Sequence, residues 1–313
     1  MGHDTMEEIL RKRWHQVDPQ FQPLKEFLLQ RFKTGIDAIL LYGSCLSPTL
    51  RTETSFPDFY FIVDEYSHFH SKLTQACLNR WLPPNIYGLQ IPPPFFRAKY
   101  CVIRWKDLLR ETCEEARDTY HIGRFSKRMA ILYTRSSALE SSLIQAAAGA
   151  VQSVVHWTVP RMPETFTLEE LILSALRFSY EGEIRLEKQD KARHLVDAQR
   201  DYYLKIYREA LHRELLNRGS SLPKDNLYQN PYRGEERKKE IVRIQRFLRK
   251  SRRRHVARWP KYIFSQKNYV DILVEKIERT HHIHIELKER ERRYPFIFGW
   301  KYLFMLLRKG LIR

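Results

Sequence analysis

Two runs of the sequence decide the fold: Ala38-Ile39-Leu40-Leu41-Tyr42-Gly43-Ser44 and Pro57-Asp58-Phe59-Tyr60-Phe61-Ile62-Val63-Asp64-Glu65. The first run is continuously apolar and ends in Gly-Ser, which is typical of a buried strand that leads into a tight turn. The second run predicts a strand at residues 59–63, opened by Pro-Asp and closed by Asp-Glu. A third strand is expected at Tyr100-Cys101-Val102-Ile103. Because helical patterns alternate with these strands, we expect an α/β or α+β domain at the start of the chain.

The other patterns are mainly helical. Apolar spacing predicts a helical lead-in over residues 6–33 and helices at 138–155, 167–180 and about 190–217. Thr167 and Glu170 have the spacing of a capping box. A chain of 313 residues is about twice the usual size of one domain. We therefore expect an α/β domain at residues 1–135, a mainly helical domain at 136–230 and a basic region at 231–313.

The net charge of +18 is unevenly placed along the chain. The segment from Arg233 to Arg313 holds 24 basic and 9 acidic residues, a net charge of +15, so the first 232 residues carry only +3. A positive excess of this size predicts an anionic partner. Composition does not choose between a nucleic acid, a lipid headgroup and a nucleotide.

The cysteines and the N-terminus argue against several classes of protein. None of the four cysteines forms a C-x-x-C pair, so neither a disulfide scaffold nor a zinc site is supported. The first residues lack the apolar core of a signal peptide, and their acids argue against a transit peptide. No stretch reaches the roughly 20 apolar residues of a membrane span. We expect a protein of a reducing compartment that does not cross a membrane.

Gly43, Ser44 and Asp58 form the first chemical pattern. A glycine lets the backbone approach a triphosphate closely, a serine hydroxyl and neighbouring N–H groups bind its phosphates, and a strand-borne carboxylate positions Mg²⁺. Nucleotidyltransferases of the polymerase-β type are assembled in this way. Taken alone, the same spacing is more often an ordinary turn followed by an acid at a strand edge.

Further blocks, in one order across residues 38–205, resemble the mitochondrial-type phosphatidate cytidylyltransferases, the translocator assembly and maintenance proteins that make CDP-diacylglycerol. The segment from Leu41 to Glu65 is similar to the family's Tyr-Gly-Ser-Gly and Asp-Phe-aliphatic-Phe pattern with its closing Asp-Asp. The later blocks are Lys99-Tyr100-Cys101-Val102-Ile103, Asp107-Leu108-Leu109, Gly123-Arg124-Phe125-Ser126-Lys127, Met162-Pro163-Glu164-Thr165-Phe166, Ser179-Tyr180-Glu181-Gly182-Glu183-Ile184-Arg185 and Lys191 with Leu195-Val196. The sequence departs from the pattern at Cys45 and Cys101, where the family has glycine, and at Tyr60, which leaves the wider superfamily's Asp-x-Asp pair unformed.

The resemblance implies a nucleotidyltransferase domain of the polymerase-β kind, a mainly helical domain of winged-helix type, and Mg²⁺-dependent transfer of cytidylyl from CTP to phosphatidate. It assigns catalysis to Asp58, Ser44 and Lys127. The nucleotide and the phosphates would be bound by Gly43, Ser44, Lys99, Arg124, Lys127, Tyr180, Arg185 and Lys191. Asp58 would bind the metal, with Glu53, Asp64 or Glu183 as second ligand. On a straight strand Asp58 and Asp64 lie roughly 20 Å apart, too far to share one ion.

The basic region favours a membrane surface. Arg233–Arg258 carries 12 basic and 3 acidic residues and would suit lipid headgroups and nucleic acid alike. Drawn as a helix, the residues after Pro295 place Trp300, Phe304 and Leu307 on one face and cations on the other, which is typical of an interfacial helix. Docking of this helix on the protein's own core is the alternative.

We therefore expect a peripheral protein of an anionic membrane with no obligatory nucleic-acid partner. A bacterial-type member would lie on the cytoplasmic face of the membrane, and a eukaryotic one on the matrix face of the mitochondrial inner membrane. Two alternatives stay open: a nucleotidyltransferase-fold enzyme that acts on RNA or protein and binds nucleic acid with its basic tail, and a catalytically inactive binding module.

Overall fold

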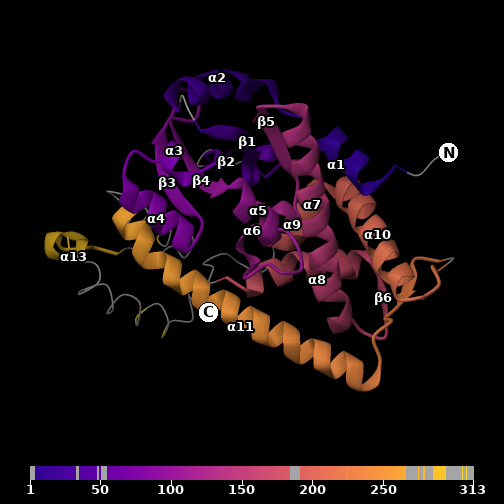
Figure 1. Ribbon diagram of the computed structural model, residues 1–313. Helices are drawn as coiled ribbons and strands as arrows, with labels where there is room; N and C mark the ends of the chain where they lie inside the picture. Colours follow the sequence, from indigo (N-terminus) through magenta and orange to yellow (C-terminus); the bar gives the residue numbers. More distant parts are fainter. Residues whose placement is uncertain are drawn as a thin grey trace.

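A five-stranded mixed sheet occupies the upper left part of the molecule in the view of Figure 1. The computed structural model describes residues 4–32, 35–47, 49–50, 55–183, 191–223, 225–265, 274, 278, 285–293, 305 and 308. The sheet consists of β1 (Ile36–Tyr42), β2 (Asp58–Val63), β3 (Asn85–Gln90), β4 (Arg97–Arg104) and β5 (Met129–Thr134), in the order β3-β4-β2-β1-β5. Within this sheet β2 and β4 run parallel, and the other neighbours pair antiparallel. The three predicted strands are confirmed, whereas β3 and β5 have no counterpart among them.

Both faces of the sheet are buried, which explains why its strands are continuously apolar. On one face, Leu41 and Phe61 pack in a cluster with residues of α2 (Gln22–Arg31) and α3 (Tyr66–Phe69). On the other face, Leu40 and Tyr60 join the larger core, to which α1 (Met6–Trp14) and the helices after β5 contribute. The sheet is thus a middle layer between two sets of helices.

The first two α-helices after β5 match the sequence prediction closely. α7 (Ser137–Thr158) and α8 (Leu168–Glu181) confirm the helices predicted at 138–155 and 167–180. Thr167 caps α8, and its side chain and that of Glu170 form the predicted capping box.

Two predicted helices are interrupted. The 3-10 helix η1 (Pro19–Phe21) separates α1 from α2 within the lead-in. The continuous helix predicted at 190–217 is wrong, because α9 (Lys191–Ala198) and α10 (Arg200–Asn217) are separate helices. Gln199, between them, has a φ of −142° and a ψ of 36°, which is not helical.

The remaining elements that the structure describes are short, apart from α11. They are η2 (Ser44–Leu46), α4 (Leu73–Trp81), α5 (Trp105–Glu111), α6 (Thr119–Phe125), η3 (Val159–Arg161), β6 (Thr165–Thr167), β7 (Leu227–Gln229), α11 (Gly234–Ser265) and α13 (Glu289–Arg293). β6 and β7 pair antiparallel as a separate two-stranded sheet.

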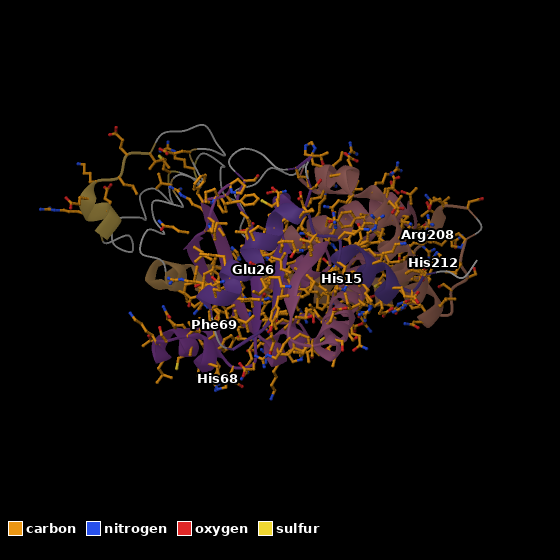
Figure 2. All side chains as sticks on the ribbon, turned by 90° about the horizontal axis from the view of Figure 1, so that it is seen from above. His15, Glu26, His68, Phe69, Arg208 and His212 are labelled. Carbon is orange, nitrogen blue, oxygen red and sulfur yellow. The ribbon has the colours of Figure 1, made fainter. Side chains whose placement is uncertain are left out.

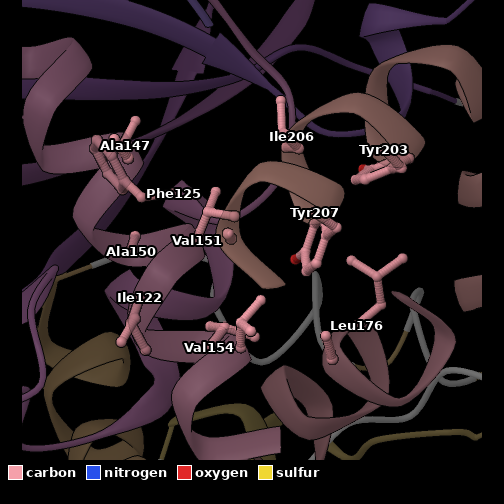
Figure 3. Packing of buried hydrophobic residues seen from close by; sticks show 14 of the residues in the cluster. Ile122, Phe125, Ala147, Ala150, Val151, Val154, Leu176, Tyr203, Ile206 and Tyr207 are labelled. Carbon is pink, nitrogen blue, oxygen red and sulfur yellow. The ribbon is translucent and has the colours of Figure 1, made fainter. Parts of the chain in front are cut away.

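α6 is held firmly in the larger core. Figure 3 shows Ile122 and Phe125 of α6 near Val151 of α7, with Leu176 of α8 and Tyr207 of α10 in the same cluster. All five side chains are buried. This short helix matters because Arg124 lies on it and Lys127 is the second residue after its end.

α11 is part of the packed body. In Figure 1 it runs along the lower edge of the molecule, past α8 and as far as α4. Ile244 and Leu248 are buried in the larger core. The residues predicted to contact a membrane, Trp300, Phe304 and Leu307, lie outside the described residues. Within the described part of the chain, no helix combines the length and the apolar character needed to cross a bilayer.

Candidate active site

One end of the sheet brings Gly43, Asp58 and Lys99 together. Tyr42 pairs with Asp58 across β1 and β2, and Asp58 lies beside Lys99 in the parallel pair of β2 and β4. Gly43 follows with a φ of +90°, which L side chains rarely adopt. A Cβ atom built on Gly43 would lie 3.1 Å from Asp58 Oδ2. Glycine is therefore favoured here both by the turn and by the carboxylate beside it.

Ser44 belongs to the same end of the sheet. It begins η2, and its Oγ atom lies 3.5 Å from Ser55 Oγ. Lys99 Nζ lies 4.7 Å from the centroid of the Phe56 ring. Asp58 is half-buried. The sheet-edge group, which we define as Gly43, Ser44, Asp58 and Lys99, thus combines a left-handed turn with a hydroxyl, a carboxylate and an ammonium group.

Arg124 forms a second charged centre. Its Nη1 atom donates to Glu183 Oε1 at 2.6 Å and to the Tyr120 carbonyl at 2.7 Å, and its Nη2 atom donates to Glu183 Oε2 at 3.3 Å. The guanidinium carbon lies 3.6 Å from the centroid of the Tyr120 ring. Burial acts against the charged form, but Glu183 and the surrounding tyrosines hold the pKa of Arg124 well above its ordinary value. Arg124 is therefore a fixed and permanent cation.

Lys127 lies against the end of α8. Its Nζ atom donates to Ser179 Oγ at 2.9 Å and lies 4.0 Å from the centroid of the Tyr180 ring. α6 and α8 approach each other closely here, because a Cβ atom built on Gly123 would lie only 2.5 Å from Ser179 Cβ. We define the α6–α8 junction as Gly123, Arg124, Lys127, Ser179, Tyr180 and Glu183.

The two stretches of sequence that form this junction are far apart in the chain, yet they are in contact. A family model described as "Phosphatidate cytidylyltransferase, mitochondrial" matches residues 87–293, more than half of the chain. The chain belongs to this family. The match begins in β3, includes Lys99 and the α6–α8 junction, and continues through α11 to the end of α13.

Phosphatidate cytidylyltransferases are nucleotidyltransferases, and the family's reaction uses CTP and phosphatidate as substrates. A nucleotidyltransferase-like protein from Exiguobacterium sibiricum is similar over 94% of this chain and 93% of that protein, at 11% sequence identity and a TM-score of 0.28, a likeness that carries no argument about the fold. No curated protein gives a significant match to the chain.

A buried polar cluster adjoins both groups, and the sequence analysis missed it. The ring centroids of Tyr42 and Tyr60 are 5.0 Å apart, and Tyr60 Oη lies 3.3 Å from His121 Nδ1. Burial holds the pKa of His121 well below its ordinary value, so the imidazole is neutral. The available signal is the alternation of β2, which places Tyr60 on the same face as Asp58.

Cys101 pairs with Tyr60 across β2 and β4 and is buried in the larger core. Burial raises the pKa of its thiol, the charge of Arg124 opposes this, and the charge of Asp58 adds to it. The thiol is therefore protonated and is a poor nucleophile. Tyr60 contacts His121 and Phe125 of α6, so the face of β2 that carries Asp58 and Tyr60 adjoins the helix that carries Arg124.

Asp64 lies at the opposite end of β2 from Asp58. His68 Nδ1 lies 2.8 Å from Asp64 Oδ2, and the Glu65 N–H donates to Asp64 Oδ1 at 2.7 Å. Burial alone would raise the pKa of Asp64, but these two contacts lower it. Figure 2 shows His68 and Phe69 on the side of the molecule away from the α10 residues. The structure therefore does not bring Asp64 to Asp58.

The other predicted residues differ in how far the structure describes them. Glu183 is engaged by Arg124 rather than directed at Asp58. Glu53 and Arg185 lie outside the described residues, as does the side chain of Lys191 at the start of α9.

The sheet-edge group fits a Mg²⁺ ion bound through one carboxylate. In the described part of the chain, no cluster of three or more His, Cys, Asp or Glu side chains could hold a metal ion. Mg²⁺ in nucleotide-dependent enzymes usually takes one or two carboxylates together with substrate phosphate oxygens, rather than an all-protein cage. Asp58 supplies such a carboxylate, and the Ser44 hydroxyl is a further oxygen nearby.

Proposed function

We propose that this chain transfers the cytidylyl group of CTP to phosphatidate with the help of Mg²⁺, at the surface of an anionic membrane. The observation that carries the proposal is the contact between α6 and the end of α8, inside the region that matches the family. The proposal is supported by the contact of His121 on α6 with Tyr60, which shares a face of β2 with Asp58, because Arg124 lies on α6 and Lys127 lies just after it. A polyanionic substrate that arrives with a metal needs cations for its phosphates and a carboxylate for the metal.

In the proposed reaction a phosphate oxygen of phosphatidate attacks the α-phosphorus of CTP. The new P–O bond forms while the bond to the β-phosphate bridging oxygen breaks, so that CDP-diacylglycerol and pyrophosphate result. Because a phosphate monoester is already an anionic nucleophile, positioning and charge neutralisation contribute more than a strong base. The neutral His121 and the protonated Cys101 are compatible with such a site.

The sheet-edge group would hold the triphosphate and the metal. Asp58 would bind Mg²⁺, which when bound neutralises charge on the triphosphate. The Ser44 hydroxyl and the backbone N–H groups after Gly43 would bind the β- and γ-phosphates, because a glycine at this position lets the backbone approach the phosphates closely. Lys99, beside Asp58, would add a positive charge.

Arg124 can bind a phosphate without releasing Glu183. A guanidinium group has five N–H donors, and three of them are used by Glu183 and by the Tyr120 carbonyl. The Nε–H and the second Nη2 hydrogen remain for phosphate oxygens, in the planar geometry that suits them. Lys127, held over the Tyr180 ring, would act as a second positive charge.

The outward face of α11 supports the membrane part of the proposal. Between Ile241 and Arg258 the helix carries no acidic residue and eight basic residues, of which six have exposed side chains, whereas Arg254 and Arg258 turn inward to Asp118. Arg246, Lys250 and Arg253 are among those with exposed side chains. Each cation near an anionic leaflet contributes about 1 kcal/mol. The family description is mitochondrial, and we place the enzyme on the matrix face of the inner membrane or, in a bacterium, on the cytoplasmic face.

The fold types of the two domains, polymerase-β for the first and winged-helix for the second, are also part of the proposal. The mixed sheet with its Gly-Ser turn and strand-borne Asp58 supports a first domain of the polymerase-β kind. The antiparallel pair β6–β7 next to α8 supports a winged-helix type of second domain.

The proposal is tested with purified protein, CTP, Mg²⁺ and vesicles that contain phosphatidate, with CDP-diacylglycerol as the measured product. We expect product formation that needs all three components and that is lost in Asp58→Ala. The absence of lipid product, or full activity of Asp58→Ala, would refute the proposal. Transfer of label to RNA or protein instead would favour the alternative enzyme class.

A further inference from the structure

α11 presents a polar face to the interior of the protein. Ser251, Arg258 and Lys261 are at most 2% exposed, although the helix lies at the edge of the molecule. Buried charged and polar groups are costly unless they are paired and hydrogen-bonded. The partners of these three side chains lie at the start of α6, at the end of α8, and at the end of α4 with the prolines that follow it.

Asp118 is the partner of two arginines of α11. The carboxylate, 1% exposed, accepts from Arg254 Nε and from Arg258 Nη2, each at 2.7 Å. Burial would raise its pKa, but Arg258 and Arg254 hold the pKa of Asp118 well below its usual range. The same side chain caps α6, because it also accepts from the Tyr120 N–H at 3.0 Å. α11 therefore fixes the side chain that begins α6.

Ser251 joins the start of α6 to the end of α8. The Thr119 N–H donates to Ser251 Oγ at 3.0 Å, and the Ser251 hydroxyl donates to the Gly182 carbonyl at 2.7 Å. A Cβ atom built on Gly182 would lie 2.7 Å from Ser251 Oγ, so the approach is tight. One hydroxyl of α11 thereby links two helix ends that have no covalent connection nearby.

Each linked residue immediately precedes a partner of Arg124. Thr119 is followed by Tyr120, whose ring lies under the guanidinium group, and Gly182 is followed by Glu183, which accepts from its Nη atoms. α6 has only seven residues, so the contacts at its start strongly influence its direction. A small rotation there would move Arg124 relative to Glu183.

We propose that Ser251, Arg254 and Arg258 are positioning residues for Arg124. They fix the start of α6 against the end of α8, and thereby set the direction in which the Arg124 guanidinium group meets a substrate phosphate. The identity of that phosphate rests on the proposed function. The positioning itself rests only on the contacts of α11, and these three residues act through Arg124 without touching the substrate.

The test uses two variants with matched controls in the full chain. Ser251→Ala removes one hydroxyl, and Arg258→Met removes one of the two guanidinium partners of Asp118. The control Ser142→Ala loses a hydroxyl that donates to the Ala138 carbonyl of its own helix. The control Arg213→Met breaks an exposed ion pair with Glu7.

In the cytidylyl-transfer assay we expect kcat/KM to fall about tenfold in Ser251→Ala and about a hundredfold in Arg258→Met, because a misplacement of about 1 Å costs this much. The controls should stay within about twofold. The double variant Arg124→Lys with Ser251→Ala should lose no more than Arg124→Lys alone, because Ser251 acts through Arg124. Additive losses would overturn the proposal.

A second measurement does not depend on activity. The NMR signal of the Arg124 Nε–H group, assigned by its disappearance in Arg124→Lys, should shift in Ser251→Ala and in Arg258→Met and stay in place in both controls. An unchanged signal in the two variants would overturn the positioning proposal. If the wild-type chain is inactive and the two variants still show the expected signal shifts, the proposed function is refuted and the positioning proposal stands.

Discussion

The sheet-edge group and the α6–α8 junction hold their functional side chains in different ways. At the sheet edge the backbone sets the positions, through strand register and the left-handed turn at Gly43, and Asp58 is only half-buried. At the junction the side chains hold one another, as in the pairs of Arg124 with Glu183 and of Lys127 with Ser179. This difference implies that chemistry and stability are separable at the sheet edge and coupled at the junction.

The largest effect is expected from Asp58→Asn. Loss of the carboxylate should lower kcat about a hundredfold to a thousandfold, because a group that stabilises charge in the reaction is removed. The free energy of unfolding, measured with urea, should change by less than the roughly 2.7–4 kcal/mol to which this loss of rate corresponds. Asp64→Asn, at the other end of the same strand, should keep its activity. An equal loss in Asp64→Asn would show that the metal is bound elsewhere than we propose.

Gly123→Ala should show the coupling at the junction most clearly. The added Cβ atom would meet Ser179 Cβ at 2.5 Å, and overpacking of this kind costs about 1–3 kcal/mol of stability. Urea unfolding should show this loss, and Ser179→Gly in the same chain should restore part of it. Gly88→Ala is the control, because a Cβ atom there has no heavy atom within 4 Å. Equal effects at both glycines would contradict a tight contact between α6 and α8.

Lys127→Met should raise the KM for a phosphate-bearing substrate about tenfold, the equivalent of about 1.4 kcal/mol, because one charge-assisted contact is lost. It should also lower the free energy of unfolding by about 1 kcal/mol, since the hydrogen bond to Ser179 is lost with it. Steady-state kinetics and urea unfolding measure the two effects. A change in KM with no change in the free energy of unfolding would contradict the coupling of activity and stability at the junction.

A dependence of stability on pH is expected to originate at Asp118. Its pKa is lowered in the folded state, so its contribution to stability is fully present above the unfolded pKa of about 3.9 and is lost as the pH falls toward the folded pKa. The urea midpoint of the wild-type chain should therefore decrease below about pH 4. Asp118→Asn should be less stable at neutral pH and should show a shallower decrease in acid. Parallel curves would mean that the carboxylate is not held by α11.

The sequence predicts the strands that are buried on both faces and misses those with a weaker pattern. β1 and β2 are continuous apolar runs because helices cover both sides of the sheet. β3 lies at the edge of the sheet, and its residues from Gly88 onward are half-buried or exposed, so it offers no such run. β5 is a short apolar run, and such runs do not distinguish a strand from a buried helix.

In the candidate site, too, the sequence predicts the features that follow from a local pattern and misses those that depend on distant residues. The turn at Gly43 and its closeness to Asp58 are local consequences of two neighbouring strands, and the sequence pattern indicates them. The pairing of Asp118 with Arg254 joins residues 136 positions apart and leaves no local pattern. A run of cations such as residues 249–254 usually marks a solvated face, and the sequence does not show that Arg254 turns inward.

The pairing of Asp118 with α11 also affects the order in which the parts of the chain fold during synthesis. Synthesis proceeds from the N-terminus, and folding generally follows it. The strands of the sheet are complete by Thr134, whereas Arg254 and Arg258 follow more than a hundred residues later. Until they emerge from the ribosome, α6 begins with a carboxylate that lacks both guanidinium groups. The sheet edge can therefore form early, while the junction must wait for the last quarter of the chain, so a product interrupted before α11 would have a folded sheet and no activity.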